Sequence, residues 1–397
     1  MPLNGYAKPL VVHVVTHPTG GGAEFLVREL NRRLPEYGVD SYAVCLANPL
    51  SVTMKEREEC LGLSSPHSPL AIQRLRAFLK RVQTPSAPMI VHAHLTWSLI
   101  YVPLASSGLG FSLFYTEHNT YNRRRQLSLA RYLDKVFYRR YQSIVCISQG
   151  VRDALDGWLC DPIIAKRLEV IYNGARILPR KTLADFEPNR LRLVSIGSLS
   201  SQKGYDVALL AVAEIRHLVS RYVIVGEGAQ RGKLERLIRQ LKLEGIVRLV
   251  GWADNITSYL HDADIALMPS RWEGFGLAAV EALSTGIPVI ASDVPGLNEI
   301  LGASPAGILV PPGNHRRLSN AVMNVAHRIK TGFDFSEAAI ETANRYGLDK
   351  MVKHYVTSYR RTIGLLQGGC PNDSERAGTV VQGIQYPKIA VAMKRRK

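Results

Sequence analysis

The stretch ADIALMPSRWEGFGLAAVEALSTGIPVIASDVPGLNEI, residues 263–300, decides the predicted fold of this chain. An apolar strand ends at Pro269, a loop with two glycines holds Glu273, and a helical pattern follows over Phe275–Leu283. A helix that opens with glycines presents unpaired N–H groups and a partial positive charge, which suits phosphate or sugar oxygens. Glu281 follows Glu273 by about two helical turns, so both carboxylates are predicted to face one cleft. The same spacing also fits a solvated helix face.

The alternation of short apolar runs with helical patterns extends through most of the chain. A first series of predicted strands comprises Leu10–Thr16, Ser41–Leu46, Met89–Ala93, Ser112–Thr116 and Ile144–Ile147. A second series comprises Arg192–Ile196, Arg221–Val225, Val247–Val250, Ile265–Met268, Val289–Ile290 and Ile308–Val310. Further helices are predicted over Ala23–Leu34, Tyr205–Leu218 and Lys233–Leu241. Because parallel strands need helical crossovers, two such series predict an α/β protein with two Rossmann-like, doubly wound parallel sheets.

The chain is predicted to divide into four segments. The polar stretch Arg180–Asn189, which contains a proline, separates an N-terminal domain (1–180) from a C-terminal domain (181–349). A late helix within 350–366 is expected to pack back on the N-terminal domain. Residues 367–397 begin with small and polar residues and end in Lys394–Lys397, so we expect a basic, disordered tail.

The bulk composition is that of a globular protein of two domains. The chain has 397 residues, too many for one ordinary core. Its five cysteines are scattered without a CxxC pair, so neither a disulfide framework nor a structural zinc site is indicated. The apolar run Leu10–Val15 is predicted to be a buried strand and not a signal peptide. We therefore expect a cytoplasmic protein, peripheral at most to the inner face of the cytoplasmic membrane.

The net charge of +17 is the unusual bulk feature, and the positive excess lies in the first half and the tail. Such a field attracts nucleic acid, an anionic membrane surface or a diphosphate-linked substrate, and a basic surface without a special partner is the plain alternative. The densest basic region contains Arg123, Arg124, Arg125, Arg131, Arg139 and Arg140. No recognised nucleic-acid module or pattern of stacking aromatic residues accompanies it, so we expect no nucleic-acid partner.

The segment Glu273–Glu281 resembles the E-x7-E motif of family 4 glycosyltransferases, which are retaining enzymes with the GT-B fold. Other segments resemble the family in order: Thr19–Glu24, Thr116–His118, Val145–Ser148, Val170–Gly174, Ser195–Leu199, Gln202–Gly204, Val223–Gly228, Val250-Gly251 and Gly307–Pro312. Each segment is a weak signal, and the ordered set over about residues 10–366 is specific. The resemblance implies that the second domain binds a nucleotide-sugar donor and the first an acceptor.

The resemblance also implies roles for individual residues. Glu281 would hold the ribose hydroxyls of the nucleotide, because a carboxylate can accept two hydrogen bonds. Lys203 would neutralise the departing diphosphate, and Glu273 would lie beside the donor sugar. The implied donor-binding set is Gly21, Gly22, Ser198, Lys203, Gly274, Phe275, Gly276, Leu277 and Glu281. Ser198 departs from the arginine that family members often carry, so either Lys203 carries more of the phosphate charge or another cation, such as Arg271, approaches.

Histidines of the first domain raise two further expectations. By resemblance, His118 lies at the reaction centre on the acceptor side, so the implied catalytic set is His118, Lys203 and Glu273. His92 and His94 alternate along one predicted strand, yet no third ligand stands at a useful spacing. We therefore expect core or cleft-edge histidines there and no metal site. The family generally works without a divalent metal, so neither a metal nor another cofactor is expected.

The predicted partners follow from these roles. In many family members the first domain docks on a membrane and meets a lipid-linked acceptor, and Arg123, Arg124 and Arg125 are the candidates for that contact. A solvated helix face is the plain alternative for these three arginines. The overall prediction is transfer of a sugar to a sugar or lipid-linked acceptor in the synthesis of capsule, exopolysaccharide or lipopolysaccharide. The alternatives are a GT-B epimerase or phosphorylase, and a non-catalytic, nucleotide-sugar-binding subunit at the membrane.

Overall fold

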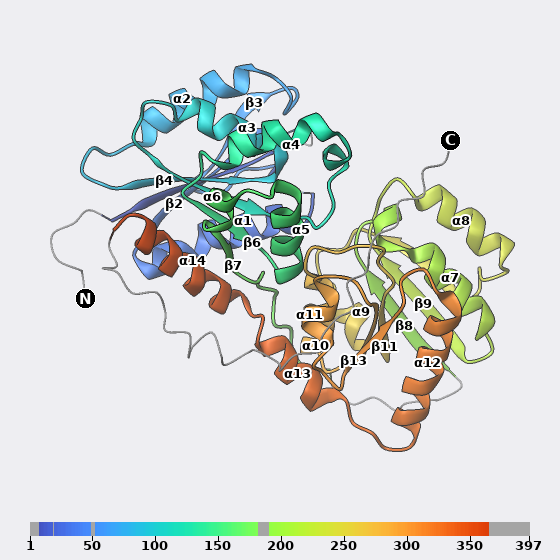
Figure 1. Ribbon diagram of the computed structural model, residues 1–397. Helices are drawn as coiled ribbons and strands as arrows, with labels where there is room; N and C mark the ends of the chain where they lie inside the picture. The colour runs from blue at the N-terminus through green and yellow to red at the C-terminus, as the bar shows by residue number, and fades with distance from the viewer. Residues whose placement is uncertain (1–7, 19, 49–51, 182–189, 365–397) are drawn as a thin grey trace.

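A computed structural model of the chain describes residues 8–18, 20–48, 52–181 and 190–364. These residues form two parallel sheets with helices packed around each, as two lobes (Figure 1). The prediction of an α/β protein with two doubly wound sheets is therefore confirmed. The predicted boundary stretch lies mostly outside the described residues, as does the predicted basic tail. Among the described helices, none has the length and apolar character needed to cross a bilayer.

The first sheet has seven parallel strands in the order β3-β2-β1-β4-β5-β6-β7. Their bounds are β1 (Leu10–Val15), β2 (Asp40–Ala47), β3 (Glu58–Leu63), β4 (Met89–His94), β5 (Ser112–Glu117), β6 (Ser143–Cys146) and β7 (Leu168–Val170). The helices of this domain are α1 (Gly22–Arg33), α2 (Leu70–Val82), α3 (Leu95–Ala105), α4 (Ser128–Tyr138), α5 (Gln149–Leu159) and α6 (Pro162–Ala165). The five predicted strands are present, while β3 and β7 were not predicted.

The second sheet has six parallel strands in the order β10-β9-β8-β11-β12-β13. Their bounds are β8 (Leu191–Ile196), β9 (Val219–Val225), β10 (Val247–Gly251), β11 (Ile265–Met268), β12 (Val289–Ser292) and β13 (Gly307–Val310). The helices are α7 (Tyr205–Glu214), α8 (Arg231–Gln240), α9 (Thr257–His261), α10 (Leu277–Ser284), α11 (Leu297–Leu301), α12 (His315–Lys330) and α13 (Ser336–Asn344). All six predicted strands are present.

The last described helix, α14 (Leu348–Thr362), returns from the second domain to the first (Figure 1). Its buried face, which includes Met351, Tyr355 and Tyr359, packs in one cluster with Val11 of β1 and Leu30 of α1. Burying an apolar helix face of this kind stabilises the contact by about 25 cal/mol for each Å² removed from water. The late helix therefore packs against the N-terminal domain.

In both sheets the strand order reverses next to the first strand. β1 lies between β2 and β4, and β8 lies between β9 and β11, so successive crossovers leave each central strand toward opposite sides. In open α/β sheets, ligands bind beyond the carboxyl ends of the strands at such a switch point. The loops after β1, β4 and β5 and those after β8 and β11 are thus the places to look for a site.

Candidate active site between the two domains

The loop after β11 joins the loop after β8 through an ion pair. Lys203 Nζ lies 2.6 Å from Glu273 Oε2. Two hydrogen bonds to backbone carbonyls fix the loops. The Arg271 N–H donates to the Gln202 carbonyl at 2.7 Å, and the side-chain Nε2 of Gln202 donates to the Trp272 carbonyl at 3.0 Å. Both side chains of the ion pair are mostly buried. The structure therefore holds a cation and a carboxylate together at the carboxyl edge of the second sheet.

Glu281 forms a second ion pair, and its partner comes from the first domain. Arg176 Nε donates to Glu281 Oε1 at 2.8 Å, and the Arg176 guanidinium carbon lies 5.3 Å from the centroid of the Phe25 ring in α1. Burial raises the pKa of the Glu281 carboxyl, and Arg176 opposes that rise. Glu281 thus lies beside the start of α1, which follows the glycine loop of the first domain.

The two motif carboxylates do not lie two turns apart on one helix. α10 begins at Leu277, so Glu273 stands in the loop before it and only Glu281 is helical. Glu273 points to Lys203 and Glu281 points to Arg176. The two carboxylates therefore have different partners at the same interface, which the spacing argument did not show.

Gly274 lies where the two domains touch. A Cβ atom at Gly274 would lie 2.2 Å from the backbone oxygen of His118. The Ser148 hydroxyl donates to the Gly274 carbonyl at 2.7 Å, and the Thr120 hydroxyl donates to the Glu273 carbonyl at 3.2 Å. A glycine is thus required at position 274 for the first domain to approach the loop this closely.

The remaining predicted donor residues lie around the starts of α1 and α10. Gly22 and Leu277 face each other across the interface, because a Cβ atom at Gly22 would lie 3.0 Å from Leu277 Cδ1. Gly21 is exposed at the N-terminus of α1. Phe275 is buried against the rings of Tyr172 and Tyr346, so its side chain packs the interface and leaves only its backbone for a ligand. Gly276, with φ of 115°, adopts a conformation that favours glycine.

The cation predicted to replace the family's arginine at position 198 is not Arg271. Ser198 is exposed and its hydroxyl lies 3.3 Å from that of Ser200. Arg271 is held by both oxygens of Asp206 and donates to the Ser201 carbonyl. Its guanidinium therefore stabilises the loop, whereas Arg176, which the sequence did not single out, brings a cation to Glu281.

On the first domain, His118 follows β5 and lies half-buried at the interface. His118 Nε2 lies 3.3 Å from His94 Nδ1. Burial lowers the pKa of His118 to about 4, although the Glu117 carboxylate opposes that shift. The imidazole is therefore neutral near pH 7, so it can donate or accept a hydrogen bond without bringing charge.

The predicted membrane arginines are engaged within the protein. Arg125 Nη2 donates to Glu117 Oε2 at 2.9 Å, and Arg124 Nη2 lies 3.4 Å from Asp134 Oδ1. Glu117 also accepts a hydrogen bond from the Asn119 N–H at 3.2 Å, so this cluster shapes the loop that carries His118. The structure thus turns Arg124 and Arg125 away from any external surface. It does not describe the side chain of Arg123.

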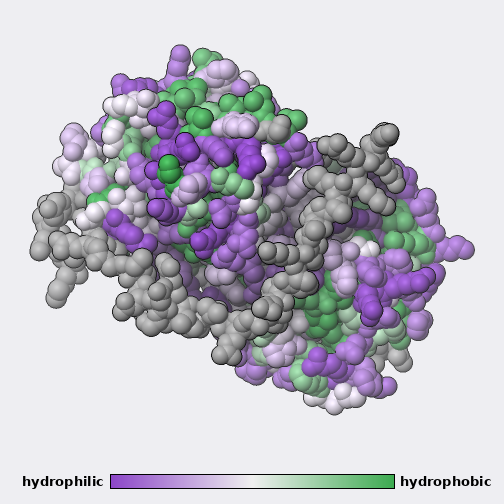
Figure 2. Space-filling model, viewed as in Figure 1, coloured by the Kyte–Doolittle hydropathy of each residue, from purple (hydrophilic) through white to green (hydrophobic). Residues whose placement is uncertain are grey.

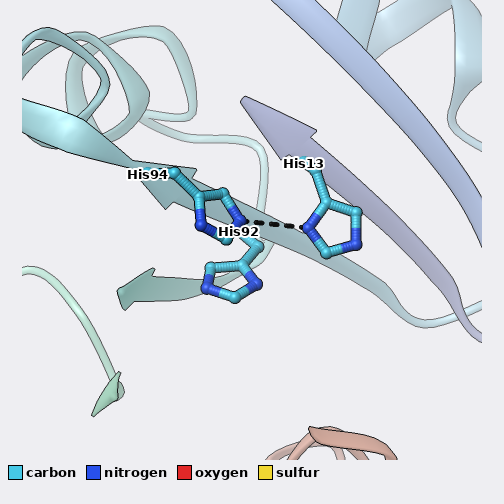
Figure 3. A group of neighbouring side chains, drawn as sticks. All are labelled: His13, His92 and His94. Carbon is cyan, nitrogen blue, oxygen red and sulfur yellow. Dashed lines mark hydrogen bonds between the residues drawn. The ribbon is translucent and has the colours of Figure 1, made fainter. Parts of the chain in front are cut away.

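Three buried histidines lie together behind His118. Figure 3 shows His13 on β1 beside His92 and His94 on β4. One ring nitrogen of each histidine lies within 4.8 Å of those of the other two. The expectation that His92 and His94 lack a third neighbour is therefore wrong, because β1 and β4 pair with His13 opposite His92. Register across strands, which spacing along one strand does not reveal, supplies the third histidine.

The sequence interpretation also missed a carboxylate that joins the domains. Glu299 of the second domain accepts hydrogen bonds from the N–H groups of Gln149 and Gly150, both at 2.8 Å, at the N-terminus of α5 in the first. A carboxylate at a helix N-terminus is favoured by the unpaired N–H groups and the helix dipole. Glu299 lies inside the stretch 263–300, but nothing in its spacing indicated a partner in the other domain.

Two doubly wound domains with a site built from the strand ends of both define the GT-B class of fold. Alr3699/HepE of Anabaena, solved in complex with UDP and glucose, is one similar structure: its TM-score is 0.77 over 89% of this chain and 100% of its own, at 18% identity. The "Glycosyltransferase Family 4" model matches residues 20–177, and the "Glycosyl transferases group 1" model matches residues 184–342. This chain belongs to the group 1 and family 4 glycosyltransferases.

Curated relatives match only part of their length. A 41.2 kDa uncharacterized protein in the cps region of Klebsiella pneumoniae is 31% identical over 50% of this chain and 56% of its own. The putative colanic acid biosynthesis glycosyltransferase WcaL of Escherichia coli is 33% identical over 36% of this chain and 37% of its own. The chain thus spans about half or less of the length of these two relatives.

Proposed function

We propose that this protein transfers a sugar from a nucleotide-sugar to an acceptor hydroxyl with retention of configuration. The observation that carries the proposal is the meeting of Lys203, Glu273 and Glu281 with the His118 loop at one interface. Family membership supports the reaction class. The solved structure with UDP and glucose supports a nucleoside diphosphate sugar as donor.

The donor would lie across the N-terminus of α10. Among the described residues, nothing accepts a hydrogen bond from the backbone N–H of Leu277 or Ala278. These groups and the helix dipole suit a phosphate or a sugar oxygen. Glu281 would accept hydrogen bonds from the ribose hydroxyls, with Arg176 keeping the carboxylate ionised.

The chemistry would need charge stabilisation more than a protein nucleophile. An acceptor hydroxyl attacks the anomeric carbon from the face that the diphosphate leaves; the new glycosidic bond forms as the bond to phosphate breaks, and the proton passes to a phosphate oxygen. Lys203 would release Glu273 in part and neutralise the leaving phosphate. Lys203 and the α10 N–H groups would take the phosphate charge, so we propose that no divalent metal is required.

The cellular role we propose is synthesis of a cell-surface polysaccharide at the inner face of the cytoplasmic membrane. The two curated relatives support this role, because one lies in a cps region and the other is assigned to colanic acid synthesis. The acceptor would be a sugar or a lipid-linked sugar.

A membrane contact is supported by α4 and not by Arg124 and Arg125. Five large apolar side chains on and just before this helix are each more than half exposed: Leu127, Leu129, Tyr132, Leu133 and Val136. Apolar side chains, green in Figure 2, gather at the edge of the first domain where Figure 1 places α4. The exposed Arg140 follows the helix, and the combination of apolar and basic side chains suits the surface of anionic lipids.

The first test is thermal unfolding with a panel of nucleoside diphosphates and nucleotide-sugars, with and without magnesium. Ligands that bind the native state raise the melting temperature. We expect one base to give a clear shift that magnesium does not change. The shift should be lost in Glu281→Ala and kept in the matched surface variant Glu337→Ala. No shift with any nucleotide would contradict the proposal.

Incubation with the shifting donor then separates transfer from the alternatives. Transfer predicts a glycoside only when a lipid or sugar acceptor is added, with the anomeric configuration of the donor preserved by NMR. An epimerase would change the sugar without acceptor, and a binding subunit would bind donor without turnover against crude lipid acceptors. Inversion of configuration would refute the retaining mechanism alone.

Sedimentation with vesicles tests the membrane contact. We expect binding to phosphatidylglycerol vesicles, weaker binding to neutral vesicles, and loss of binding when Leu129 and Leu133 are changed to serine. Trp252→Ser, an exposed aromatic residue of the second domain, is the control. Equal binding by both variants would place the contact elsewhere.

A further inference from the structure

Hydrogen bonds connect His13, His94 and His118 in a row, which we call the histidine row. His13 Nδ1 lies 3.1 Å from His94 Nε2, and His94 Nδ1 lies 3.3 Å from His118 Nε2. Figure 3 shows the first of these contacts as a dashed line between β1 and β4. The histidine row thus runs from the buried interior of the first domain to the loop that touches Gly274.

We infer that His13 and His94 are positioning residues that fix the tautomer of His118, so that His118 Nε2 accepts from His94 and His118 Nδ1 carries the proton. This inference rests on the proposed function only in assigning His118 to the reaction centre. It concerns where one proton sits, which is measurable without any transfer reaction.

The number of protons on the three rings limits the direction in which hydrogen bonds are donated along the histidine row. Burial lowers the pKa values of all three histidines, so each is neutral and carries one N–H. Two neutral arrangements satisfy both contacts: every N–H points toward His118, or every N–H points toward His13. In the second arrangement the proton at the far end would sit on His13 Nε2.

His13 Nε2 is the atom that chooses between the two arrangements. It is buried and has no hydrogen-bond partner among the described residues. An orphaned buried N–H is rarer in proteins than an acceptor without a donor. The favoured arrangement therefore leaves a lone pair at His13 Nε2. His13 Nδ1 then donates to His94 Nε2, and His94 Nδ1 donates to His118 Nε2.

A metal ion is the competing occupant of the group, and the contacts argue against it. His92 already uses both nitrogens, with Tyr359 OH at 2.6 Å and the Thr116 hydroxyl at 2.8 Å. His94 also uses both ring nitrogens, one with His13 and one with His118. Ligation by His13, His92 and His94 would break these hydrogen bonds, and no carboxylate within the described residues joins the group to offset a buried divalent charge.

The histidine row would hold a hydrogen-bond donor, the N–H at His118 Nδ1, in a fixed position at the interface. His118 Nδ1 makes no hydrogen bond within the described part of the chain. A neutral N–H held there can donate to an oxygen of the donor sugar or the leaving phosphate without the cost of reorienting the ring. His94 and His13 would act only through His118.

Nitrogen NMR of the wild-type protein with labelled histidine tests the tautomer directly. We expect protonated Nδ1 and unprotonated Nε2 in His118, His94 and His13. Protonated Nε2 in His118 would overturn the inference. So would stoichiometric zinc bound to the purified protein after equilibration with the metal, because ligation would use the same lone pairs.

Three variants separate positioning from packing. His94→Leu should release His118 to the Nε2–H tautomer and lower the transfer rate by about 10- to 100-fold, the usual cost of losing an orienting partner. His94→Asn, whose side-chain amide reaches the Nδ1 position, should restore the tautomer. His92 is equally buried but is not part of the histidine row, so His92→Leu should leave the His118 tautomer unchanged. An unchanged His118 tautomer in His94→Leu would refute the inference, while loss of donor binding by Glu281→Ala would still uphold the proposed function.

Discussion

The two domains bring different chemistry to their shared interface. The second domain presents charged side chains, with Lys203 paired to Glu273 and Glu281 paired to an arginine from across the interface. The first domain presents a neutral row of histidines and a backbone carbonyl, and its charged contribution is that one arginine, Arg176. Charge that develops on a leaving phosphate needs a cation nearby, whereas a neutral N–H can orient an oxygen without adding charge. Under the proposed function, the second domain would therefore supply most of the charge and the first a neutral, oriented hydrogen-bond donor.

The largest expected effect comes from acidifying the histidine side of this comparison. Burial lowers the pKa of His13 to about 3 and that of His118 to about 4, and the pKa values of His92 and His94 also lie well below 6.5. As pH falls through 6.5 the unfolded chain binds protons that the folded chain does not. Stability is therefore lost between about pH 6.5 and 4, at up to about 1.4 kcal/mol per pH unit for each histidine.

Hydrogen exchange measured by mass spectrometry at several pH values checks this prediction, after correction for the intrinsic exchange rate. Peptides from β1, β4 and β5 should lose protection from pH 7 to pH 5, while those from β8 and β11 keep theirs. Equal loss in both domains would remove the distinction between the two sides of the interface.

The second prediction tests the charged side. Lys203→Ala should lower the transfer rate by about 100- to 1000-fold, because it removes the cation nearest the proposed leaving group and leaves Glu273 without its partner. Single-turnover kinetics with the donor identified by thermal unfolding is the measurement. Lys233→Ala, an exposed lysine of α8, should react at the wild-type rate. A fully active Lys203→Ala would move charge stabilisation elsewhere.

The third prediction concerns the contact that joins the two sides. In Gly274→Ala a Cβ would lie 2.2 Å from the His118 carbonyl oxygen, so the loop at residue 274 and the His118 loop must move apart. Transfer should fall by about 10- to 100-fold, since small misplacements of reacting groups are costly. Small-angle scattering should show a more open protein with an unchanged melting temperature. Gly232→Ala, where a Cβ would meet only Arg236 Nη1 at 3.8 Å, an ordinary van der Waals contact, is the control; wild-type transfer by Gly274→Ala would contradict close approach.

The fold was predictable from sequence where strands are buried on both faces. β1 and β4 are uninterrupted buried runs, so apolar pattern alone identified them. β3 lies at the edge of the sheet, begins with Glu58-Glu59 and is partly exposed, which gives no such pattern. β7 has only three residues. Short strands and edge strands are missed by a prediction from sequence, because hydrogen bonding to a neighbouring strand, and not an apolar pattern, defines them.

The site was predictable in part for a similar reason. The resemblance singled out Glu281 and His118 as candidates, but the residues linked to them lie far away in sequence. Arg176 is 105 positions from Glu281, and His13, which reaches His118 through His94, is 81 positions from His94. Contacts between domains or across strand register leave no spacing signal in one chain. Glu273 lies in the loop before α10, as the glycines on either side of Phe275 indicated, but its ion pair with Lys203 could not be read from the spacing.

The smallest expected effect crosses the interface at Arg176. Burial raises the pKa of Glu281 and Arg176 opposes it, so Arg176→Ala should raise that pKa further and leave more of the carboxyl protonated near neutral pH. Calorimetric affinity for the nucleoside diphosphate should weaken by about tenfold at pH 7, equivalent to about 1.4 kcal/mol, and recover as pH rises. Arg180→Ala, whose guanidinium pairs with Glu337, should change nothing. A loss that persists at high pH would show that Arg176 contacts the nucleotide itself, so that the first domain also contributes charge and the division between the two sides is incomplete.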